Sequence, residues 1–378
     1  MFIQRGLFLK IAQICPRYSP DIGGVETHVK EISERLVRAG HDVEVITTDP
    51  SGKLEKRDTI NGVKILRFRS FAPGNAYYFA PQIYFYLKKH NFDVIHAHSY
   101  HALPALFAAL GKRGRRFVFT PHYHRSGHTA FRNLLHKPYR LFGKVIFSRS
   151  DSVICVSEYE KRLVEADFRV EGKTVKIPNG VNLKEFEHLR NSQKGKGVEK
   201  KRGKEKTLLY VGRLEEYKGV QYIIQSLPEL KDFRLRVVGK GPYEEELRNM
   251  AKSMEVEERV EWLKDLSRKE LLECYADADI FLMLSSHEAY GITVAEALAT
   301  GTPCVVAKGS ALEEFVDGEN CVGIENPVTA EKVIDSLQKI EIFKREPVSG
   351  RLKGIMDWNE VSARIEKEYI KQSNKTNH

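Results

Sequence analysis

One stretch of this chain constrains the fold more than any other: residues 285–301, which lie between two short apolar runs. The runs at 280–284 and 304–307 have the length and composition of buried strands, and the stretch between them is apolar enough for a helix. Gly291 allows the backbone to turn from strand into helix, and a second glycine closes the stretch as a helix stop. The pattern predicts a β-α-β unit with its helix at about residues 292–300.

Two carboxylates in this unit, Glu288 and Glu296, lie eight residues apart. We expect Glu288 in the loop before the helix and Glu296 in its second turn, among apolar neighbours. Burying an unpaired carboxylate is costly, so Glu296 should meet a hydrogen-bond donor or a polar ligand. An ordinary helix with a solvent-exposed face would explain the spacing equally well. The amides that could bind an anion at the helix start are those of Tyr290, Gly291, Ile292 and Thr293.

The whole stretch resembles the E-x7-E signature of family 4 glycosyltransferases, which are retaining enzymes with the GT-B fold. A leucine stands where the family usually has proline, and Ala-Tyr replaces a Gly-Phe pair, whereas both carboxylates and Gly291 are kept. The resemblance implies that Glu296 holds the ribose hydroxyls of a nucleotide sugar and that Glu288 holds the sugar.

Length and composition limit the possible classes of protein. A chain of 378 residues suits two domains of ordinary size. No apolar stretch approaches the roughly 18 residues of a membrane span, and no signal peptide is evident, so we expect a cytoplasmic protein. The five cysteines are scattered without a C-x-x-C pair, which favours reduced core residues.

Short apolar runs separated by helical or loop segments fill the first half and predict a mostly parallel, doubly wound sheet. The first strand is followed by a loop with Gly23 and Gly24 and by a helix at 25–39. Such glycines allow a ligand to approach the backbone closely, or simply serve the turn. The pair resembles the Gly-Gly loop that lies beside the donor diphosphate in the same glycosyltransferases. The predicted strands are residues 7–15, 43–47, 63–68, 94–97, 117–120 and 152–156.

Eight of the thirteen histidines fall within residues 90–136, so a metal site must be considered. We expect His96 and His98 to point to opposite sides of their strand. Residues 94–150 contain no cysteine or carboxylate, and the H-E-x-x-H pattern is absent. Zinc is therefore the less favoured interpretation, and we predict no metal site.

A different role is implied for the histidine at the end of the strand at 117–120. His122 resembles the family histidine that contacts the transferred sugar, and His124 is the alternative if the register is shifted. The element I-P-N-G-V-N at 177–182 resembles the family's I-P-N-G-V-D.

The second half begins at residue 207, and residues 207–219 read T-L-L-Y-V-G-R-L-E-E-Y-K-G. A strand delivers Arg213 to its carboxyl end, and Lys218 follows near a helix start, so both cations can converge on a pair of phosphates. The segment resembles the family's G-R-x4-K-G pattern. This implies that the two cations neutralise the donor diphosphate in place of a divalent metal ion.

A predicted strand at 233–238 ends in a loop with Gly239 and Gly241, tight enough for the backbone to contact a planar base. By itself this pattern is weak. Neither a G-x-G-x-x-G fingerprint nor a Walker loop occurs in the chain, which disfavours a dehydrogenase or a P-loop kinase.

The net charge of +10 is concentrated, because residues 94–150 contain ten Lys and Arg but no Asp or Glu. A field of one sign over this length attracts an anionic partner, and the candidates are an anionic membrane at its inner face, a phosphorylated acceptor and nucleic acid. Residues 130–149 mix apolar and basic side chains as a membrane-surface helix would, interrupted by Pro138. A core-facing helix with a basic solvent side fits equally well. No recognised nucleic-acid motif occurs, so we expect no nucleic acid partner.

Together these features predict an α/β chain of the GT-B fold, with two Rossmann-like doubly wound parallel-sheet domains facing a cleft. We expect an N-terminal acceptor-side domain at 1–185 and a nucleotide-sugar-binding domain at 207–355. A basic linker at 186–206 is expected because the segment is rich in Lys, Gly and Glu. A helix at 356–378 should cross back to the N-terminal domain.

The predicted activity is the transfer of a hexosyl unit, with retention, from a nucleoside-diphosphate sugar to a lipid, glycan or small-molecule acceptor, without a metal or other cofactor. The alternatives are another GT-B activity, such as a sugar-nucleotide 2-epimerase or a phosphorylase, and a non-catalytic polyanion-binding protein. The catalytic residues implied by the resemblance are His122, Glu288, Arg213 and Lys218. The donor-binding residues that it implies are Gly23, Gly24, Gly239, Gly241, Tyr290, Gly291, Ile292, Thr293 and Glu296.

Overall fold

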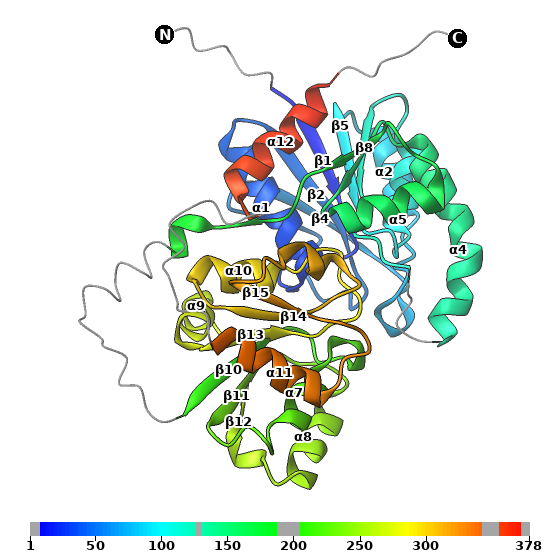
Figure 1. Ribbon diagram of the computed structural model, residues 1–378. Helices are drawn as coiled ribbons and strands as arrows, with labels where there is room; N and C mark the ends of the chain where they lie inside the picture. Colours follow the sequence, from blue (N-terminus) through cyan, green and yellow to red (C-terminus); the bar gives the residue numbers. More distant parts are fainter. Residues whose placement is uncertain (1–7, 126–129, 187–204, 342–354, 372–378) are drawn as a thin grey trace, which may run out of the picture. The chain divides into compact units, whose positions relative to one another are not determined.

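The computed structural model describes residues 8–125, 130–186, 205–341 and 355–371 (Figure 1). The chain forms two compact units, the first comprising Met1–Gly180 with Trp358–His378 and the second Val181–Asp357. The last stretch of the chain thus belongs to the same unit as its beginning. Most of the predicted linker at 186–206 lies outside the described residues.

The first unit is built on an eight-stranded sheet with the order β3-β4-β2-β1-β5-β6-β7-β8. All its pairings are parallel except that of β3 with β4, an antiparallel pair at the sheet edge. The central strands are almost fully buried, as apolar strands covered on both faces should be. The strands are β1 (Lys10–Ile14), β2 (Asp42–Asp49), β3 (Arg57–Ile60), β4 (Val63–Arg69), β5 (Val94–His98), β6 (Arg116–Thr120), β7 (Ser152–Cys155) and β8 (Thr174–Lys176).

Helices cover both faces of this sheet, with α1 and α12 on one side and α2, α4 and α5 on the other (Figure 1). Helix α4 continues through Pro138, where we expected an interruption, although proline removes one hydrogen bond of the helix. The helices are α1 (Gly24–Arg38), η1 (Pro73–Asn75), α2 (Gln82–Lys89), α3 (Pro104–Gly111), α4 (Ala130–Arg149), α5 (Glu158–Phe168) and α12 (Trp358–Ile370).

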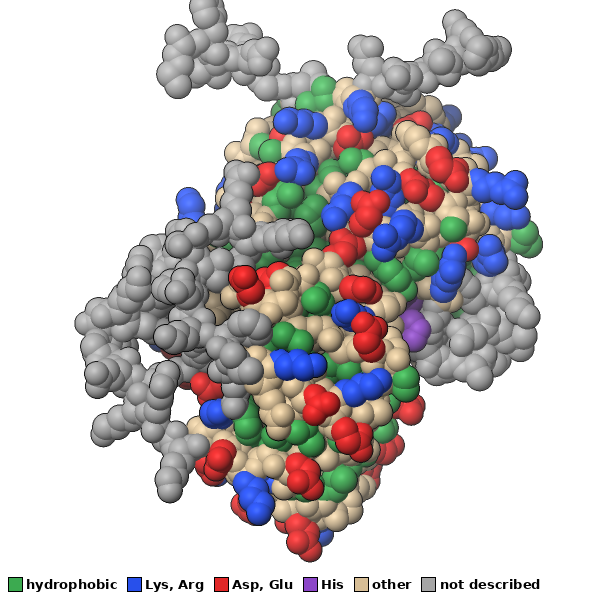
Figure 2. Space-filling view, viewed as in Figure 1, with side chains coloured by type: hydrophobic (Ala, Val, Ile, Leu, Met, Phe, Trp, Pro, Cys, Tyr) green, Lys and Arg blue, Asp and Glu red, His purple; other side chains and the backbone are tan. Residues whose placement is uncertain are grey.

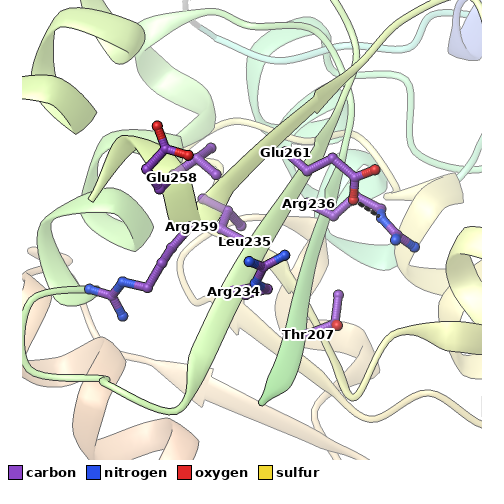
Figure 3. A pocket seen from close by; sticks show the side chains of 8 residues that line it. Thr207, Arg234, Leu235, Arg236, Glu258, Arg259 and Glu261 are labelled. Atoms are coloured by element: carbon purple, nitrogen blue, oxygen red, sulfur yellow. Dashed lines mark hydrogen bonds and ion pairs between the residues drawn. The ribbon is translucent and has the colours of Figure 1, made fainter. Parts of the chain in front are cut away.

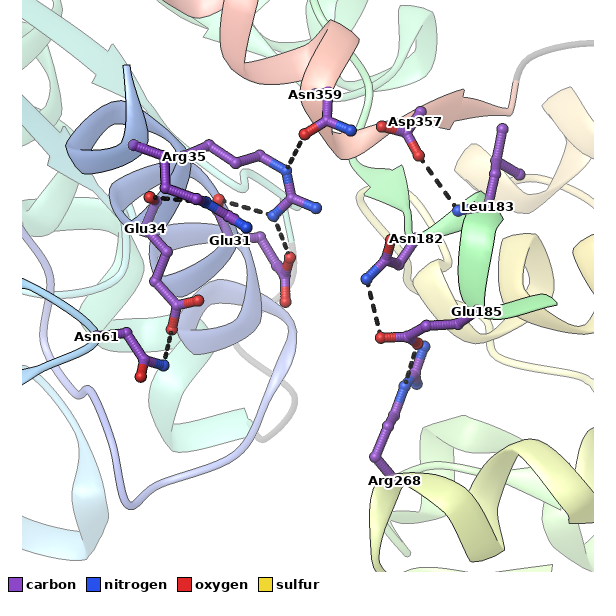
Figure 4. Close-up of polar contacts among 11 residues, drawn as sticks. Glu31, Glu34, Arg35, Asn61, Asn182, Leu183, Glu185, Arg268, Asp357 and Asn359 are labelled. Atoms are coloured by element: carbon purple, nitrogen blue, oxygen red, sulfur yellow. Dashed lines mark hydrogen bonds and ion pairs between the residues drawn. The ribbon is translucent and has the colours of Figure 1, made fainter. Parts of the chain in front are cut away.

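The C-terminal helix α12 is bound to the first unit by polar contacts at both of its ends. Near its start, Arg35 Nε of α1 donates to Asn359 Oδ1 at 3.0 Å (Figure 4). Near its end, the buried Tyr369 hydroxyl lies 3.0 Å from Gln13 Nε2 and 2.7 Å from His96 Nδ1. Two buried polar side chains of the first sheet, Gln13 and His96, therefore have a hydrogen-bond partner from the far end of the chain.

The second unit contains a six-stranded parallel sheet with the order β12-β11-β10-β13-β14-β15. Helices α9 and α10 lie on one face, and α7, α8 and α11 lie on the other (Figure 1). The strands are β10 (Lys206–Val211), β11 (Phe233–Val238), β12 (Val260–Leu263), β13 (Ile280–Met283), β14 (Cys304–Ala307) and β15 (Cys321–Ile324). The helices are η2 (Glu216–Lys218), α7 (Val220–Ser226), α8 (Glu244–Ser253), η3 (Glu257–Arg259), α9 (Arg268–Asp277), α10 (Ile292–Thr300), η4 (Ala311–Phe315) and α11 (Ala330–Glu341). Strands β9 (Gly180–Val181) and β16 (Met356–Asp357) pair where the chain passes from one unit to the other.

Both sheets have the doubly wound order 3-2-1-4-5-6 when their parallel strands are numbered along the chain, with one further strand at each edge of the first. The predicted α/β fold with two Rossmann-like parallel sheets is confirmed. The order reverses between β1 and β5 in the first unit and between β10 and β13 in the second. Ligands of such sheets bind outside the carboxyl ends of the strands at this reversal. The loops after these four strands are therefore where a site should be sought.

Candidate functional site

The loop after β10 carries the two cations predicted from the sequence. Arg213 follows the end of β10 by two residues, and Lys218 ends the η2 turn. The Tyr210 hydroxyl donates to the Arg213 carbonyl oxygen at 2.7 Å, which fixes the start of the loop. The Arg213 guanidinium pairs with Glu215, and its side chain is 61 % exposed. Arg213 is thus accessible to an anion from solution.

Lys218 connects the loop after β10 with the loop after β13. Its ammonium group pairs with the Glu288 carboxylate, and the two side chains are 13 % and 19 % exposed. The Ser286 amide donates to the Tyr217 carbonyl oxygen at 3.0 Å, which holds the two loops together. Burial lowers the pKa of Lys218, but the attraction of Glu288 outweighs it, so the pKa is raised and the amine stays charged. Two predicted site residues far apart in sequence therefore meet at the strand-order reversal.

The loop that carries Glu288 leads directly into α10. Gly291, the residue before the helix, has a φ of +107°, and a Cβ there would lie 2.6 Å from the Leu312 side chain. The turn therefore requires glycine. The first amides of α10, on Ile292 and Thr293, have no acceptor in a preceding turn, so the helix presents its positive end beside Glu288.

Glu296 lies buried in the second turn of α10 and has two partners from α9. Arg268 Nη1 lies 2.6 Å from Glu296 Oε1, and the Tyr275 hydroxyl donates to Oε2 at 2.9 Å. Arg268 also pairs with Glu185 at 3.0 Å (Figure 4). Burial lowers the pKa of Arg268, but its two carboxylates outweigh this and raise it. The donors expected for Glu296 are thus two side chains of the chain itself. A carboxylate has about four lone pairs, so some of them stay available for a ligand.

The loop with Gly239 and Gly241 packs directly against the backbone of the loop after β10. The Leu214 amide donates to the Lys240 carbonyl oxygen at 3.1 Å. A Cβ on Gly239 would overlap the carbonyl oxygen of Gly212, and one on Gly241 would overlap that of Leu214. Both glycines are therefore required by contact between two backbones, whether or not a base also binds there.

The loop after β1 places Gly23 and Gly24 at the start of α1. A Cβ on Gly23 would meet the carboxylate of Glu26, which is buried and pairs with Arg17 at 2.9 Å. A Cβ on Gly24 would have nothing within 4 Å. A side chain at position 23 would displace the Glu26 carboxylate, whereas the space beside Gly24 would admit a ligand.

His122 follows β6 and is held in an unusual backbone conformation, with a φ of +47°. The neighbouring Tyr123 amide donates to Glu160 Oε1 at 2.5 Å, and the Val156 amide donates to Oε2 at 2.6 Å. Glu160 is fully buried, and its own amide donates to Ser157 Oγ at 2.9 Å. Burial lowers the pKa of His122 well below 6.5, so the ring is neutral at physiological pH. One carboxylate thus ties the His122 loop to the end of β7.

This geometry predicts the effect of Glu160→Gln. The amide can accept only one of the two bonds and turns an NH2 toward the other donor, so we expect a loss of about 1–3 kcal/mol in unfolding free energy. We also expect kcat of the sugar transfer predicted from the sequence to fall roughly tenfold as His122 loses its position, with the Kd of the predicted donor nucleotide unchanged. Glu158→Gln, at a 45 % exposed position of the same helix, is the matched control and should change neither quantity. Equal kcat in both variants would contradict the positioning role.

His96 and His98 do not point apart, and that expectation was wrong. Residues two apart in a strand share a face, and the two ring centroids lie 4.1 Å apart. His98 also lies near His122, with ring centroids 6.2 Å apart. His124 belongs to a different contact, since its ring stacks on His101 at 4.4 Å.

Comparison with known proteins identifies the family. Residues 22–185 match the model described as Glycosyltransferase Family 4, and residues 191–346 match the one described as Glycosyl transferases group 1. An uncharacterized glycosyltransferase of Methanocaldococcus jannaschii is 30 % identical over 336 residues, which cover 82 % of this chain and 83 % of the relative. The chain belongs to glycosyltransferase family 4.

Two further similarities extend this result. The phosphatidylinositol N-acetylglucosaminyltransferase GPI3 subunit of Saccharomyces cerevisiae is 25 % identical over 95 % of this chain and 82 % of its own length. The solved structure of sucrose-phosphate synthase from Thermosynechococcus elongatus matches with a TM-score of 0.76 at 18 % identity, covering 96 % of this chain and 98 % of the other. The GT-B fold and the glycosyltransferase activity predicted from the sequence are confirmed. The alternative activities are not favoured.

Much of the basic stretch 94–150 of this family 4 enzyme serves the fold. Arg125 pairs with Asp167 at 2.9 Å. On α4, Leu141 is 64 % and Phe142 is 43 % exposed, and Lys144 beside them is exposed. The residues that donate to main-chain carbonyl oxygens of the first unit are Lys112, Arg113, Arg115, Arg116, Arg140 and Arg149. The side chains of residues 130–138 lie outside the described ones.

The membrane contact expected from the sequence can be compared with the surface charge of the second unit and with the length and hydropathy of the helices. On the visible face of the second unit, acidic and basic side chains are intermixed without a patch of one sign (Figure 2). Among the helices that the structure describes, none is both long and apolar enough to cross a membrane.

A pocket in the second unit lies away from the site of this glycosyltransferase. It is found near the amino ends of β10, β11 and β12 (Figure 3), whereas Arg213 and Lys218 follow the carboxyl end of β10. Beside it, the Thr207 amide donates to Asp279 at 2.8 Å, so this aspartate has a structural partner. The pocket is lined by Thr207, Arg234, Leu235, Arg236, Glu258, Arg259, Val260 and Glu261.

Several residues that contact or neighbour the predicted site residues were missed from the sequence. His98 could have been found from its spacing, because two histidines in alternate strand positions must share a face. Glu160 follows Ser157 in the S-x-x-E pattern of a helix start, which marks it as a residue that bonds backbone amides. Arg268 and Tyr275 carry no local signal, since only the packing of α9 on α10 brings them to Glu296.

Proposed function

We propose that this chain transfers a hexosyl unit with retention from a nucleoside-diphosphate sugar to a lipid-linked acceptor at a membrane surface, without a metal ion. The observation that carries the donor side is the convergence of Arg213, Lys218, Glu288 and the positive end of α10 at the strand-order reversal of the second unit. The two cations and the amides at the helix start suit a diphosphate, and the Glu288 carboxylate holds Lys218 beside them.

Arg213 and Lys218 would stabilise the departing diphosphate. Negative charge grows on this group as the glycosidic bond breaks, and a preorganised cation lowers that barrier without needing to rearrange. Lys218 is already charged and held in place by Glu288. The two cations would therefore replace the divalent ion that other sugar-nucleotide enzymes use.

Glu288 and Glu296 would bind the donor rather than react with it. Glu288 pairs with Lys218, which makes it a poor nucleophile but leaves a second oxygen for a sugar hydroxyl. Glu296 would accept from the ribose hydroxyls with lone pairs that Arg268 and Tyr275 do not fill. The neutral His122 would contact the sugar, and retention would follow from attack on the face that the diphosphate leaves.

Two observations support a lipid-linked acceptor. Leu141 and Phe142 expose large apolar surfaces beside the basic Lys144 on α4, a combination typical of membrane-surface helices. The yeast relative, whose name states that it acts on phosphatidylinositol, matches nearly the whole chain. The surface of the chain that we expect to contact an anionic bilayer is therefore the part of α4 that carries Leu141, Phe142 and Lys144.

The donor proposal is tested by thermal stabilisation and nucleotide release with UDP-, GDP- and ADP-sugars, each with and without a chelator. We expect one donor series to stabilise the enzyme, with the response unchanged by the chelator, and its transferred sugar to keep the anomeric configuration. Loss of the response in the chelator would overturn the metal-independent mechanism. Stabilisation by none of the donors would overturn the assignment of the site.

The membrane proposal predicts weaker vesicle binding for the double variant Leu141→Gln/Lys144→Gln. Each basic residue near an anionic surface contributes about 1 kcal/mol, and burying a leucine side chain contributes about 1.5–3 kcal/mol. Co-sedimentation with phosphatidylglycerol vesicles should therefore weaken by roughly two to three orders of magnitude. The control is Lys269→Gln, whose side chain is 85 % exposed in the second unit. Equal sedimentation of both variants would contradict the role of α4.

A further inference from the structure

Three histidines that belong to different elements meet at the strand-order reversal of the first unit. His28 lies in α1 just after β1, His98 ends β5, and His122 follows β6. The ring centroid of His28 lies 5.3 Å from that of His98 and 5.2 Å from that of His122. One nitrogen from each ring falls within 4.8 Å of the others. His28 and His98 are not among the residues proposed to bind the donor.

Hydrogen bonds determine which nitrogen of two of these rings carries the proton. His28 Nδ1 donates to Asn179 Oδ1 at 2.6 Å, and His98 Nε2 donates to Gln13 Oε1 at 2.8 Å. Amide oxygens only accept, so each ring is protonated on the side facing its amide. The opposite nitrogen of each ring is left as a bare lone pair. Metal-binding histidines are oriented in the same way, by giving their other N–H to an oxygen acceptor.

The opposite nitrogens are buried and have no partner. Among the described side chains, His28 Nε2, His98 Nδ1 and His122 Nε2 are inaccessible to water and make no hydrogen bond. His28 and His98 have no exposed surface. A buried polar atom without a partner is costly, and three such atoms on rings that lie this close together call for a common ligand. Burial lowers the pKa of His28 to about 4 and those of the other two well below 6.5, so all three rings are neutral.

We propose that His28, His98 and His122 form a binding site for a divalent transition-metal ion of the Zn²⁺ class. Three neutral imidazoles suit Zn²⁺, Co²⁺ or Ni²⁺, and they leave a fourth position for water. Bonds of about 2.0–2.1 Å would bring the three nitrogens to roughly 3.3 Å from one another. Since the nitrogens lie within 4.8 Å of one another, each pair would close by at most about 1.5 Å around the ion. Mg²⁺, which prefers oxygen ligands, should not bind.

The site has a consequence that rests on the proposed function. His122 has been assigned to the transferred sugar, and its unpartnered nitrogen is Nε2. A metal ion that takes this nitrogen fixes the ring in its buried position and so keeps it from the sugar. The metal is thus an inhibitor that competes with the donor, and the enzyme can remain metal-independent in catalysis.

Metal binding is tested on the chain without a histidine tag, by titration with Co²⁺ and by displacement with Zn²⁺. We expect the visible absorption of a tetrahedral Co²⁺ site at one equivalent per chain. His28→Gln or His98→Gln should weaken binding about hundredfold or more, and Asn179→Leu, which removes only the acceptor of His28, should weaken it roughly tenfold to hundredfold. His90→Gln is the matched control, because His90 lies at the end of α2, where its Nδ1 lies 2.9 Å from the Tyr86 carbonyl oxygen. Wild-type binding in His28→Gln would overturn the site.

The wild-type chain gives a second measurement that needs no folded variant. Zn²⁺ should raise its melting temperature and Mg²⁺ should not, because a ligand that binds only the folded state stabilises it. Absence of both a Co²⁺ band and a Zn²⁺ shift would overturn the proposal.

Inhibition is tested separately from binding. Zn²⁺ should inhibit sugar transfer competitively with the nucleotide sugar, and His28→Gln should be resistant. Metal binding without inhibition would overturn the shared use of His122. If no nucleotide sugar supports transfer, the proposed function fails, while the Co²⁺ titration still decides whether the metal site exists.

Discussion

Replacing Lys218 with methionine is expected to lower kcat by roughly two to three orders of magnitude, the usual cost of losing one preorganised donor to a developing charge. Lys218 is held by Glu288 in a largely buried position, so neither water nor a neighbouring cation can take its place easily. Glu288 is left unpaired in this variant, and the free energy of unfolding should also fall by about 1–3 kcal/mol. Single-turnover kinetics with saturating donor would measure the first effect, and urea unfolding the second.

The matched control for this change is Lys240→Met. Lys240 lies at the carboxyl end of the neighbouring strand and pairs with Asp265, but both side chains are at least 70 % exposed. Exposed pairs contribute little, so its kcat should stay within about twofold of wild type. Loss of stability in Lys218→Met without loss of kcat would show that the Lys218–Glu288 pair only holds the two loops together.

Glu296→Gln is expected to weaken binding of the donor nucleotide roughly hundredfold. A hydrogen bond to a charged group contributes about 1.5–3 kcal/mol, and a ribose offers two hydroxyls to the same carboxylate. The glutamine side chain has nearly the same shape, so most of the effect should come from charge and lone pairs. Calorimetric titration with the nucleoside diphosphate identified by the donor series is the measurement.

The 2′-deoxy nucleotide separates this role from a structural one. The wild-type enzyme should bind the ribose form at least tenfold more tightly than the deoxy form, and Glu296→Gln should reduce that preference. Tyr275→Phe, which removes one internal donor to Glu296 and leaves the carboxylate in place, should keep it. An unchanged preference in Glu296→Gln would mean that the carboxylate serves only to neutralise Arg268.

Local signals in the sequence were enough to place the central elements of the second unit. The bounds of β11, β14 and α10 agree with prediction to the residue. Each has a turn or stop signal next to an apolar run, and such signals act over a few residues. The spacing of Arg213 and Lys218 was predictable for the same reason, because strand, loop and helix follow one another without a break.

Contacts between distant segments could not be predicted in this way. Glu296 was expected to need a donor, but the sequence does not indicate that Arg268 and Tyr275 supply it. The histidine cluster was also missed, because its members lie in three separate elements that only the parallel sheet brings together. Basic residues read as a ligand-binding surface proved in several cases to bond carbonyl oxygens of their own unit.

The position of α12 has a consequence for the order in which the enzyme is made. Gln13 donates to the Tyr369 hydroxyl and accepts from His98, so the interior of the first unit includes a residue near the end of the chain. All of Val181–Asp357 must leave the ribosome before that residue appears, a delay of roughly 10–40 s at ordinary elongation rates. The half of the protein that is synthesised first is therefore the last to mature, and an incomplete nascent chain cannot form a finished His98 environment.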